Sequence, residues 1–338
     1  MSENTASQRT NPLPRWRGFN LLGMFNRRRS GEFDERDFDL IAEWGFDFVR
    51  LPLCYRLWLK DPDYFDSDVE ESSLAELDRA VEMGLSRRLH VCINFHHAPG
   101  YCINSRVGEP GNLWRDDDAL ELFCRHWDLM ARRYSGQEGI SFNLVNEPPE
   151  PDDPTMSRDD HERVMRTAID RIRRIDPDRM IILDGLAAGR LPCPELADTG
   201  AAQSCRGYHP LGVSHYKARW VDGNRWPEPT WPGAVGWYGR TWDRSTLEEF
   251  YRPWGELIDS GVGVHCGEGG CYNRTPHDVF LRWFRDVLEI LTSYGIGWAL
   301  WNLRGPFGVL DSGRADVNYE PFRGHKLDRK LLELLQEF

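Results

Sequence analysis

Residues 140–148 read Ile-Ser-Phe-Asn-Leu-Val-Asn-Glu-Pro, a short and nearly continuous apolar run that ends in two polar residues and a proline. A run of this kind is typical of a strand buried on both faces, because a half-exposed strand would alternate apolar and polar residues. We therefore predict a buried strand whose end carries Asn146 and Glu147.

The same kind of run recurs along the chain and alternates with amphipathic stretches. The predicted strands are 18–22, 46–53, 89–96, 140–146, 180–184, 207–215, 263–267 and 296–301. The predicted helices are 34–44, 71–87, 115–134, 157–175, 244–259, 275–294 and 326–336, whereas a helix in the Pro- and Gly-rich connection 185–206 is doubtful. Eight β/α units within 338 residues predict an α/β protein with a single (β/α)8 TIM barrel. A doubly wound open sheet is the alternative, but the turn after the first strand lacks GxGxxG and no GxxxxGK[ST] occurs.

Composition restricts the possible partners. The formal net charge is −12, which argues against nucleic acid because phosphate binding needs clusters of Lys and Arg. A membrane partner is not expected, because no run approaches the roughly 18 consecutive apolar residues of a membrane span. The 14 Trp residues are consistent with sugar binding, since indole faces stack on pyranose rings, and equally with a Trp-rich core.

The N-terminal segment and the cysteines indicate the domain bounds and the cellular compartment. Residues 1–14 form a polar lead-in that we expect to be poorly ordered, and one domain is expected over 15–338. No secretory signal is visible at the start. The eight cysteines include no CxxC pair and favour free thiols over a zinc ribbon. We therefore expect a cytoplasmic protein, or a secreted one if a leader has been removed.

Polar and aromatic residues recur at the carboxyl ends of the predicted strands. Catalytic groups of TIM barrels lie at these ends, so these residues are expected to converge on one face. Two carboxyls across a barrel mouth suit cleavage of a glycosidic bond, in which one protonates the leaving oxygen and the other attacks the anomeric carbon. The residues are Arg50, His96, His97, Asn146, Glu147, His215, Tyr216, Glu268, Trp301 and Asn302.

Five segments in this order resemble a known family. They are Arg50-Leu51-Pro52, Asn94-Phe95-His96, residues 144–148 (LVNEP), residues 267–270 (GEGG) and residues 298–302 (WALWN). Spread over residues 16–336, they resemble glycoside hydrolase family 5, the cellulase family of clan A retaining β-glycosidases. The resemblance implies hydrolysis of a β-linked glycan by double displacement. Because two carboxyls supply both nucleophile and proton, we expect no metal and no organic cofactor.

Site roles are carried over residue by residue. The resemblance implies that Glu147 is the acid/base and Glu268 the nucleophile. It implies that Asn146 binds the sugar 2-hydroxyl at the cleavage subsite, and that Arg50 holds the nucleophile ionised.

Aromatic and histidine positions complete the implied site. His96 would line the donor side of the cleft and Trp301 would lie under the −1 sugar, although a place in the core is the alternative for Trp301. His97 is included among the candidate binding residues, with packing as its alternative role.

The chain departs from the family pattern on strand six, where members usually carry His-x-Tyr. It reads Ser214-His215-Tyr216-Lys217, so the tyrosine that should touch the nucleophile is either Tyr216 in a shifted register or missing. His209, in Gly207-Tyr208-His209-Pro210, competes with His215 as the histidine of this strand.

The longest connection, 217–244, contains five tryptophans. A long irregular segment in a compact domain is usually functional or disordered, and dense aromatics argue against disorder. We expect this segment to shape the substrate cleft, with Trp220 and Trp231 as sugar platforms.

The expected substrate is β-glucan or its oligosaccharides, attacked by endo-β-1,4-glucanase action. Exo-acting β-glucosidase, β-mannosidase or mannanase activity is the alternative. A metal-dependent amidohydrolase is more distant, because it needs His-x-His with both side chains facing inward, whereas His96 and His97 are adjacent and expected to face opposite ways. A non-catalytic sugar-binding protein would be marked by loss of Glu147 or Glu268, and both are present.

Overall fold

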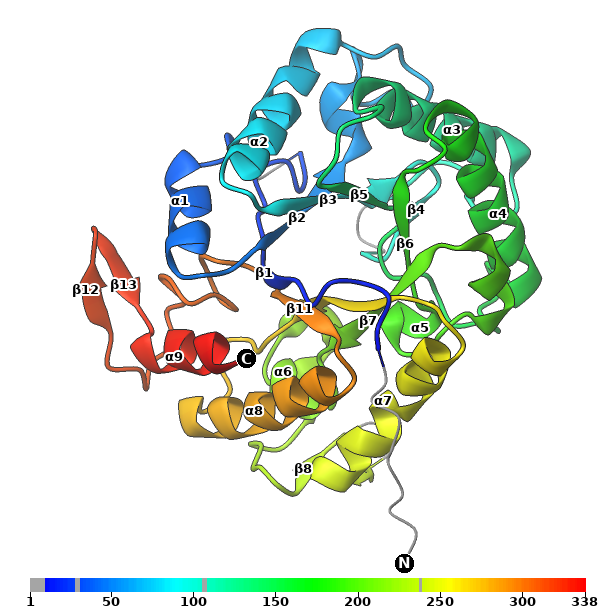
Figure 1. Cartoon of the computed structure of the whole chain (residues 1–338). Helices are drawn as coiled ribbons and strands as arrows, with labels where there is room; N and C mark the ends of the chain where they lie inside the picture. Colours follow the sequence, from blue (N-terminus) through cyan, green and yellow to red (C-terminus); the bar gives the residue numbers. More distant parts are fainter. Residues whose placement is uncertain (1–9, 28–30, 105–107, 237–238) are drawn as a thin grey trace, which may run out of the picture.

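The computed structural model describes residues 10–27, 31–104, 108–236 and 239–338. Eight parallel strands form a ring in the order β2-β1-β11-β10-β7-β6-β5-β3, and β2 pairs with β3 to close it (Figure 1). The predicted TIM barrel is confirmed. Its strands are β1 (Arg17–Asn20), β2 (Phe48–Cys54), β3 (His90–Ala98), β5 (Ile140–Asn143), β6 (Met180–Asp184), β7 (Ala202–Gly207), β10 (Val264–Gly269) and β11 (Gly297–Leu300).

Long helices cover the outside of the barrel and agree with the predicted ranges to within a few residues. They are α1 (Glu35–Glu43), α2 (Ala75–Ser86), α3 (Asp117–Arg133), α4 (Arg158–Ile175), α7 (Arg244–Asp259), α8 (His277–Ser293) and α9 (Arg329–Glu337). The connection from β6 to β7, all of which is described, holds only the short elements α5 (Leu186–Gly189) and η3 (Pro194–Thr199). The doubt about a helix in 185–206 is therefore confirmed.

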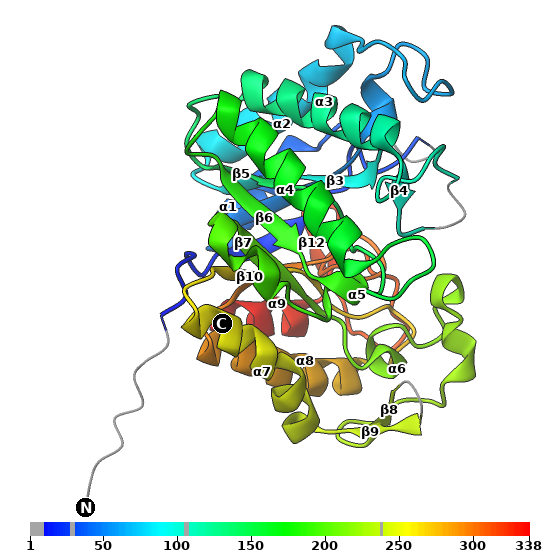
Figure 2. The same cartoon turned by 90° about the vertical axis from the view of Figure 1, so that its right-hand side faces the viewer.

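Short elements fill the remaining loops. Figure 2 shows α6 and β8 on the side of the barrel away from the N-terminus, beyond the carboxyl ends of the strands. These short elements are η1 (Tyr55–Trp58), η2 (Glu71–Leu74), β4 (Tyr101–Cys102), α6 (Leu211–Ser214), η4 (Arg219–Val221), η5 (Gly223–Arg225), β8 (Ala234–Val235), β9 (Thr241–Trp242), β12 (Glu320–Phe322) and β13 (His325–Leu327).

The sixth barrel strand lies earlier than predicted. The prediction of 207–215 is wrong, because β7 ends at Gly207 and residues 211–214 form α6. The segment Ala-Gln-Ser-Cys-Arg-Gly has few apolar residues, so its pattern does not indicate a buried strand. Its polar groups are satisfied inside the protein: Gln203 bonds both the N–H and the carbonyl of Cys193 at 2.8 and 2.7 Å, and Ser204 accepts from the Gly267 N–H at 3.1 Å. Hydrogen bonding removes most of the cost of burying polar groups, which lets this segment form an interior strand.

Residues 11–14 close the amino-terminal end of the barrel. The Asn11 amide donates to the carbonyls of Val264 (2.7 Å) and Gly295 (3.0 Å) and accepts from the Val264 N–H at 3.0 Å. Leu13 is buried beside Phe48 and the other apolar residues that fill this end. The expected lead-in over 1–14 is therefore wrong for residues 11–14, and residues 1–9 lie outside the described residues.

Much of the tryptophan content belongs to the core between barrel and helices. Six tryptophans are among the largest fully buried side chains of the described residues: Trp58, Trp114, Trp127, Trp254, Trp283 and Trp298. The high Trp count is therefore in large part a matter of packing.

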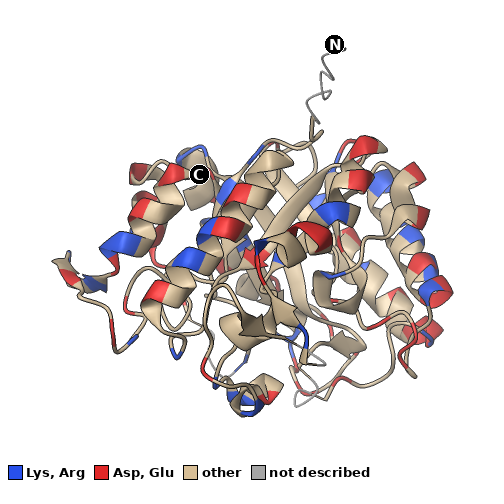
Figure 3. Cartoon of the chain, turned by 90° about the horizontal axis from the view of Figure 1, so that it is seen from below, with Lys and Arg blue, Asp and Glu red and all other residues tan. Residues whose placement is uncertain are grey.

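The surface helices carry both signs of charge. On the helices that face the viewer in Figure 3, acidic and basic residues are interspersed. Within the part of the chain that the structure describes, no helix is long and apolar enough to cross a bilayer.

Candidate active site

Glu147 is held at the end of β5 by two hydrogen bonds to its backbone. Its φ of +50° lies in the left-handed region, which costs a non-glycine residue about 1–2 kcal/mol. Its N–H donates to Asp184 Oδ2 at 2.9 Å, and its carbonyl accepts from the Tyr101 hydroxyl at 2.5 Å. The loop after β5 is thus fixed from β6 and from β4, which offsets the cost of the backbone conformation.

Glu268 is aimed into the barrel by a bulge in β10. Cys266 pairs with Cys205 and Glu268 with Arg206, so Gly267 is an extra residue without a partner on β7. Bulges of this kind redirect the following side chain. Glycine suits position 267, because a Cβ there would lie 2.7 Å from Ser204 Oγ and would displace that hydroxyl, which accepts from the Gly267 N–H.

Both carboxyl oxygens of Glu268 are engaged. Arg50 Nη1 donates to Oε1 at 2.6 Å, and the Tyr208 hydroxyl donates to Oε2 at 3.1 Å. The Glu268 side chain is only 4% exposed. Charge-assisted bonds of this length stabilise the carboxylate and fix its orientation.

The tyrosine beside Glu268 is Tyr208, and the expectation for Tyr216 is wrong. Since β7 ends at Gly207, Tyr208 is the first residue beyond the strand and points at the barrel mouth. Tyr216 follows α6 and is buried with the Lys217 ammonium over its ring at 4.8 Å. The apparent loss of the tyrosine on strand six arose from the wrong strand position.

Arg50 joins the candidate nucleophile to three asparagines. Its Nε donates to Asn143 Oδ1 (3.0 Å), Nη1 donates to Asn20 Oδ1 (2.9 Å), and Nη2 donates to Asn146 Oδ1 (2.9 Å). The residue is 1% exposed. Arg50 is therefore a buried barrel residue and a partner of Glu268 at the same time.

Arg206 on β7 is a site residue that the sequence did not reveal. Its Nε donates to Glu147 Oε1 at 3.0 Å and its Nη2 to Glu268 Oε1 at 3.5 Å. Nη1 and Nη2 also donate to the two oxygens of Asp184. The spacing Arg206-Gly207-Tyr208 matches the family's His-x-Tyr with Arg in the first position, and this was the signal that could have located it.

Asp184, at the end of β6, is the second missed residue. Burial alone would raise the pKa of Asp184, but the guanidiniums of Arg206 and Arg50 and the N–H of Glu147 outweigh burial and hold that pKa below its ordinary value. Asp184 also accepts from Asn143 Nδ2 at 3.0 Å. Its place at the carboxyl end of a correctly predicted strand was the signal for it.

The environment of Glu147 favours its protonated form. Burial and the negative charge of Glu268 raise the pKa of Glu147 to about 7, and Arg206 opposes this rise. One carboxyl of the pair is therefore a proton donor near neutral pH, and the other is a carboxylate in an ion pair. This is the division of labour that glycosidic-bond cleavage requires.

The side-chain amide of Asn146 has a defined orientation. Its Oδ1 accepts from Arg50 Nη2 at 2.9 Å and from Arg206 Nη2 at 3.1 Å. Arginine has no acceptor, so the oxygen must face the two guanidiniums. Its Nδ2 is buried without a hydrogen-bond partner among the described residues, and it is a donor available to a ligand hydroxyl.

His96 and Trp301 lie together at the end of the barrel. Their ring centroids are 5.5 Å apart, and Phe25 contacts both rings at 4.6 and 5.6 Å. Trp301 is only partly buried. Burial lowers the pKa of His96 well below its ordinary value, and the nearby His97, Arg50 and Arg206 lower it further. The His96 imidazole is therefore neutral.

His97 does not face away from His96 as expected. The two ring centroids are 5.7 Å apart, and Phe25 also contacts His97 at 5.8 Å. The strand pairing explains this: Leu53 pairs with Phe95 and Cys54 with His97, so His96 is the extra residue of a bulge and the strict alternation of side chains is lost. His97 is 3% exposed and packs at the edge of the site.

Of the two rival histidines, His215 is the one that contacts Tyr208, the tyrosine bonded to Glu268. Its ring lies 5.1 Å from that of Tyr208 and 6.0 Å from that of Trp220. His209 instead stacks on Phe250 of α7 at 4.7 Å, and its carbonyl accepts from Trp283, so it is a packing residue between barrel and helices.

The two tryptophans expected as platforms have different surroundings. Trp220 is 51% exposed and its ring adjoins Tyr272 at 4.9 Å. Trp231 is 3% exposed, and its Nε1 donates to Asp286 of α8 at 2.8 Å. The expectation that Trp231 binds substrate is therefore corrected, because its indole is buried against α8. Trp237, in the same connection, lies outside the described residues.

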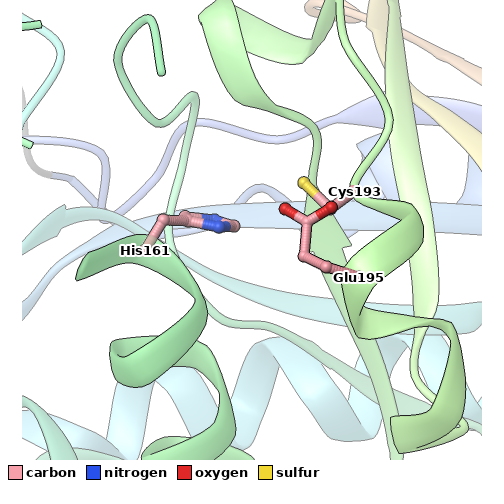
Figure 4. Close-up of side chains that lie close together, drawn as sticks. All are labelled: His161, Cys193 and Glu195. Atoms are coloured by element: carbon pink, nitrogen blue, oxygen red, sulfur yellow. The ribbon is translucent and has the colours of Figure 1, made fainter. Parts of the chain in front are cut away.

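A group of possible metal donors lies apart from these contacts. Figure 4 shows His161 on α4 facing Cys193 and Glu195, and their donor atoms lie within 4.8 Å of one another. Both Glu195 oxygens already accept from Arg158 Nη1, at 2.7 and 2.9 Å. A cation placed there would be repelled by this guanidinium, so we interpret the group as an ion pair packed beside buried His161 and Cys193.

Comparisons with known proteins agree with this geometry. A family model described as cellulase (glycosyl hydrolase family 5) matches residues 6–305. A solved structure described as a glycoside hydrolase has a TM-score of 0.90 and 42% identity, covering 96% of this chain and 99% of its own. Endoglucanase C of Acetivibrio thermocellus is 26% identical over 339 residues, which cover 90% of this chain and 95% of the relative. Cellodextrinase A of Ruminococcus flavefaciens is 26% identical over 300 residues, 83% of each chain.

The family model spans most of the barrel and includes both site carboxyls. The similar solved structure covers nearly the whole chain. This protein belongs to glycoside hydrolase family 5, the cellulase family, and is a glycoside hydrolase that acts on O-glycosidic bonds.

Proposed function

We propose that this chain is a retaining endo-β-1,4-glucanase that acts on β-glucan and its oligosaccharides. Glu268 is the nucleophile and Glu147 the acid/base. The observation that carries the assignment is the asymmetry of the two carboxyls: Arg50 and Tyr208 hold Glu268 as a carboxylate, while the pKa of Glu147 is raised to about 7. The names of the relatives, an endoglucanase and a cellodextrinase, support a β-glucan substrate.

Glu147 and Glu268 reverse their roles between the two steps of the reaction. In the first step a Glu268 oxygen bonds to the anomeric carbon, the glycosidic C–O bond breaks, and the Glu147 proton goes to the leaving oxygen. In the second step a water oxygen bonds to the anomeric carbon, the ester C–O bond breaks, and the water proton returns to Glu147. Glu147 therefore carries out both proton transfers and Glu268 forms the covalent intermediate. Because neither step needs a metal ion, activity should survive EDTA.

Asn146 is proposed to donate to the 2-hydroxyl of the sugar being cleaved. The two guanidiniums hold its amide oxygen, so only the NH₂ group is free to point at the ligand. A bond from this group to the 2-hydroxyl strengthens as charge develops in the transition state.

Sugar-ring binding is assigned to two aromatic groups. Trp301 with His96 and Phe25 forms the floor under the sugar that is attacked. Trp220, half exposed beside His215, is the platform for a more distant sugar. A flat indole buries a large apolar area at low conformational cost, which suits a stack on a pyranose face.

The catalytic roles are tested by Glu268→Ala, Glu147→Ala and a control. Glu268→Ala should abolish turnover, and azide should restore it with formation of a glycosyl azide of inverted configuration. Glu147→Ala should spare aryl glycosides with good leaving groups more than unactivated oligosaccharides. Glu195→Gln, which alters another arginine-held carboxylate, should keep wild-type activity. Near-wild-type hydrolysis of an unactivated glycoside by either alanine variant would refute the assignment.

The substrate is tested by product time courses on cellopentaose, mannopentaose and carboxymethylcellulose. Mixed oligomers with falling viscosity support endo action on β-glucan. Release of monosaccharide alone would identify an exo-acting β-glucosidase or β-mannosidase. Activity on mannans without activity on any glucan would refute the glucan assignment.

A further inference from the structure

Arginine replaces the family's usual strand-six histidine in this chain. Tyr208 takes the tyrosine position of His-x-Tyr through its bond to Glu268, so the residue two places before it, Arg206, stands where a histidine is usual. A buried histidine is neutral or weakly basic, whereas arginine is always charged. The substitution therefore adds a fixed positive charge to the interior of the barrel mouth.

Arg206 is the cation that bonds both catalytic carboxyls. Its side chain has no exposed surface; Nε donates to Glu147 at 3.0 Å and Nη2 to Glu268 at 3.5 Å. Arg50 forms ion pairs with Glu268 at 2.6 Å and with Asp184 at 3.8 Å, so among the described residues it is bonded to only one of the two catalytic carboxyls.

Asp184 balances the added charge. It accepts from Nη1 and Nη2 of Arg206, and like Arg206 it is fully buried. With Glu147 protonated, two arginines face two carboxylates, those of Asp184 and Glu268. When Glu268 becomes an ester and Glu147 a carboxylate, the count is again two against two.

We propose that Arg206, anchored by Asp184, is a positioning residue that stabilises the negative charge first on Glu268 and then on Glu147 during each turnover. Nη2 stabilises Glu268 before the anomeric carbon is attacked, and Nε stabilises Glu147 once its proton has gone to the leaving group. Because the guanidinium is a rigid fork, both bonds form without moving the side chain. This inference rests on the proposed roles of Glu147 and Glu268.

Removing Arg206 should act mainly on the second half of the reaction. The groups around Glu147 that can influence its ionisation are Tyr101, Cys102, Asp184, Arg206, Tyr208 and Glu268. Among them Arg206 lowers the pKa of Glu147, so its loss should raise that pKa. Glu147 would then remain an acid to higher pH. In the second half its carboxylate would lose the Nε bond that orients it towards water, and Glu268 would lose the Nη2 bond that stabilises it as it leaves.

The test compares Arg206→Met with wild type on an aryl β-cellobioside. The alkaline limb of kcat/KM should move to higher pH. Hydrolysis of the glycosyl-enzyme should slow by about tenfold or more, the effect of losing a bond between charged groups. A pre-steady-state burst of phenol should appear, and azide, which needs no general base, should speed steady-state turnover.

Three further variants separate this role from a structural one. Arg206→Met with Asp184→Asn removes both charges, so that no unpaired ion is buried. Arg206→Lys keeps the charge but lacks the fork, so the burst should appear with a smaller shift of the alkaline limb. Arg179→Met breaks the buried Arg179–Asp176 ion pair elsewhere in the barrel, and it should lower stability with the wild-type pH profile and no burst.

The outcomes separate this inference from the proposed function. If the folded Arg206 variants show the wild-type alkaline limb and no burst, the inference is overturned, while azide rescue of Glu268→Ala would still support the function. If both methionine variants fail to fold, Arg206→Lys decides: a wild-type profile without a burst overturns the inference. If Glu268→Ala and Glu147→Ala both remain active on unactivated glycosides, the function itself fails.

Discussion

The ionisation of Glu147 depends on the charge of Glu268, so Glu268→Gln should lower the pKa of Glu147 from its value of about 7. Burial is the largest cause of the raised pKa and the Glu268 charge the second, while Arg206 opposes both. Glutamine removes the charge but keeps the volume and one hydrogen-bond acceptor. The substitution also imitates the glycosyl-enzyme, in which Glu268 is a neutral ester.

The size of the effect follows from the charges. The rise in the pKa of Glu147 from 4.5 to about 7 corresponds to about 3 kcal/mol against ionisation, at about 1.4 kcal/mol per pKa unit. Two unit charges at the roughly 5.5 Å spacing of retaining glycosidases repel by about 3 kcal/mol at an effective dielectric constant of about 20. Arg206 contacts both carboxyls and screens them, so we expect about half of this repulsion and a fall of about 1 pKa unit.

The pKa of Glu147 can be followed by carbon-13 NMR titration of protein labelled at the glutamate carboxyls. Glu147→Gln identifies the resonance by its disappearance. Glu109, whose pKa is also raised by burial but which pairs with Arg56, is the internal control and should not change. If the Glu147 resonance still titrates near 7 in Glu268→Gln, the coupling between the two carboxyls is refuted and burial alone sets the pKa.

Three further predictions concern pH, substrate contacts and stability. Wild-type kcat/KM on unactivated oligosaccharides should fall as pH rises through about 7, because Glu147 must carry its proton; a flat alkaline profile would contradict this. Trp220→Ala should raise KM for long oligosaccharides with little change in Tm, whereas Trp231→Ala should lower the free energy of unfolding by about 3–5 kcal/mol with KM unchanged; the reverse pattern would exchange their roles. Tm should fall steeply as pH drops below 6.5, since each buried neutral histidine then opposes folding by about 1.4 kcal/mol per pH unit. The histidine pKa values in the folded protein lie below 6.5, so the unfolded chain takes up protons first as the pH falls. A constant Tm below pH 6.5 would count against burial of these histidines as neutral groups. The histidines are His90, His96, His97, His126, His161, His209, His215 and His265.

The barrel could be predicted because most of its elements are visible in short stretches of chain. The runs 46–53 and 89–96 appear as β2 and β3, and the amphipathic stretch 244–259 as α7 with the same bounds. In these elements apolar side chains supply most of the burial, so the periodicity of the sequence reports the structure directly. The site carboxyls were visible for the same reason, since each follows an apolar strand.

Strand β7 could not be predicted in this way. Its interior side chains are polar, and their partners come from distant parts of the chain: Gln203 bonds Cys193, Ser204 bonds Gly267, and Arg206 bonds Glu147 and Asp184. No local pattern records such partners. The misplaced strand then moved the tyrosine to Tyr216 and hid Arg206.

The sequence by itself determined the alternation of strands and helices, the family, and the positions of Asn146, Glu147 and Glu268 near the carboxyl ends of their strands, whereas Arg50, predicted late in its strand, is the third residue of β2. Only the tertiary structure decided that Trp220 is exposed whereas Trp231 packs against α8, and that Tyr208 is the tyrosine that reaches Glu268. The physical reason is that burial of an apolar side chain is favourable wherever the chain can fold it inward, so periodicity along the chain predicts it. A buried polar or charged group is stable only with partners brought from other strands, and those partners exist only once the barrel has closed.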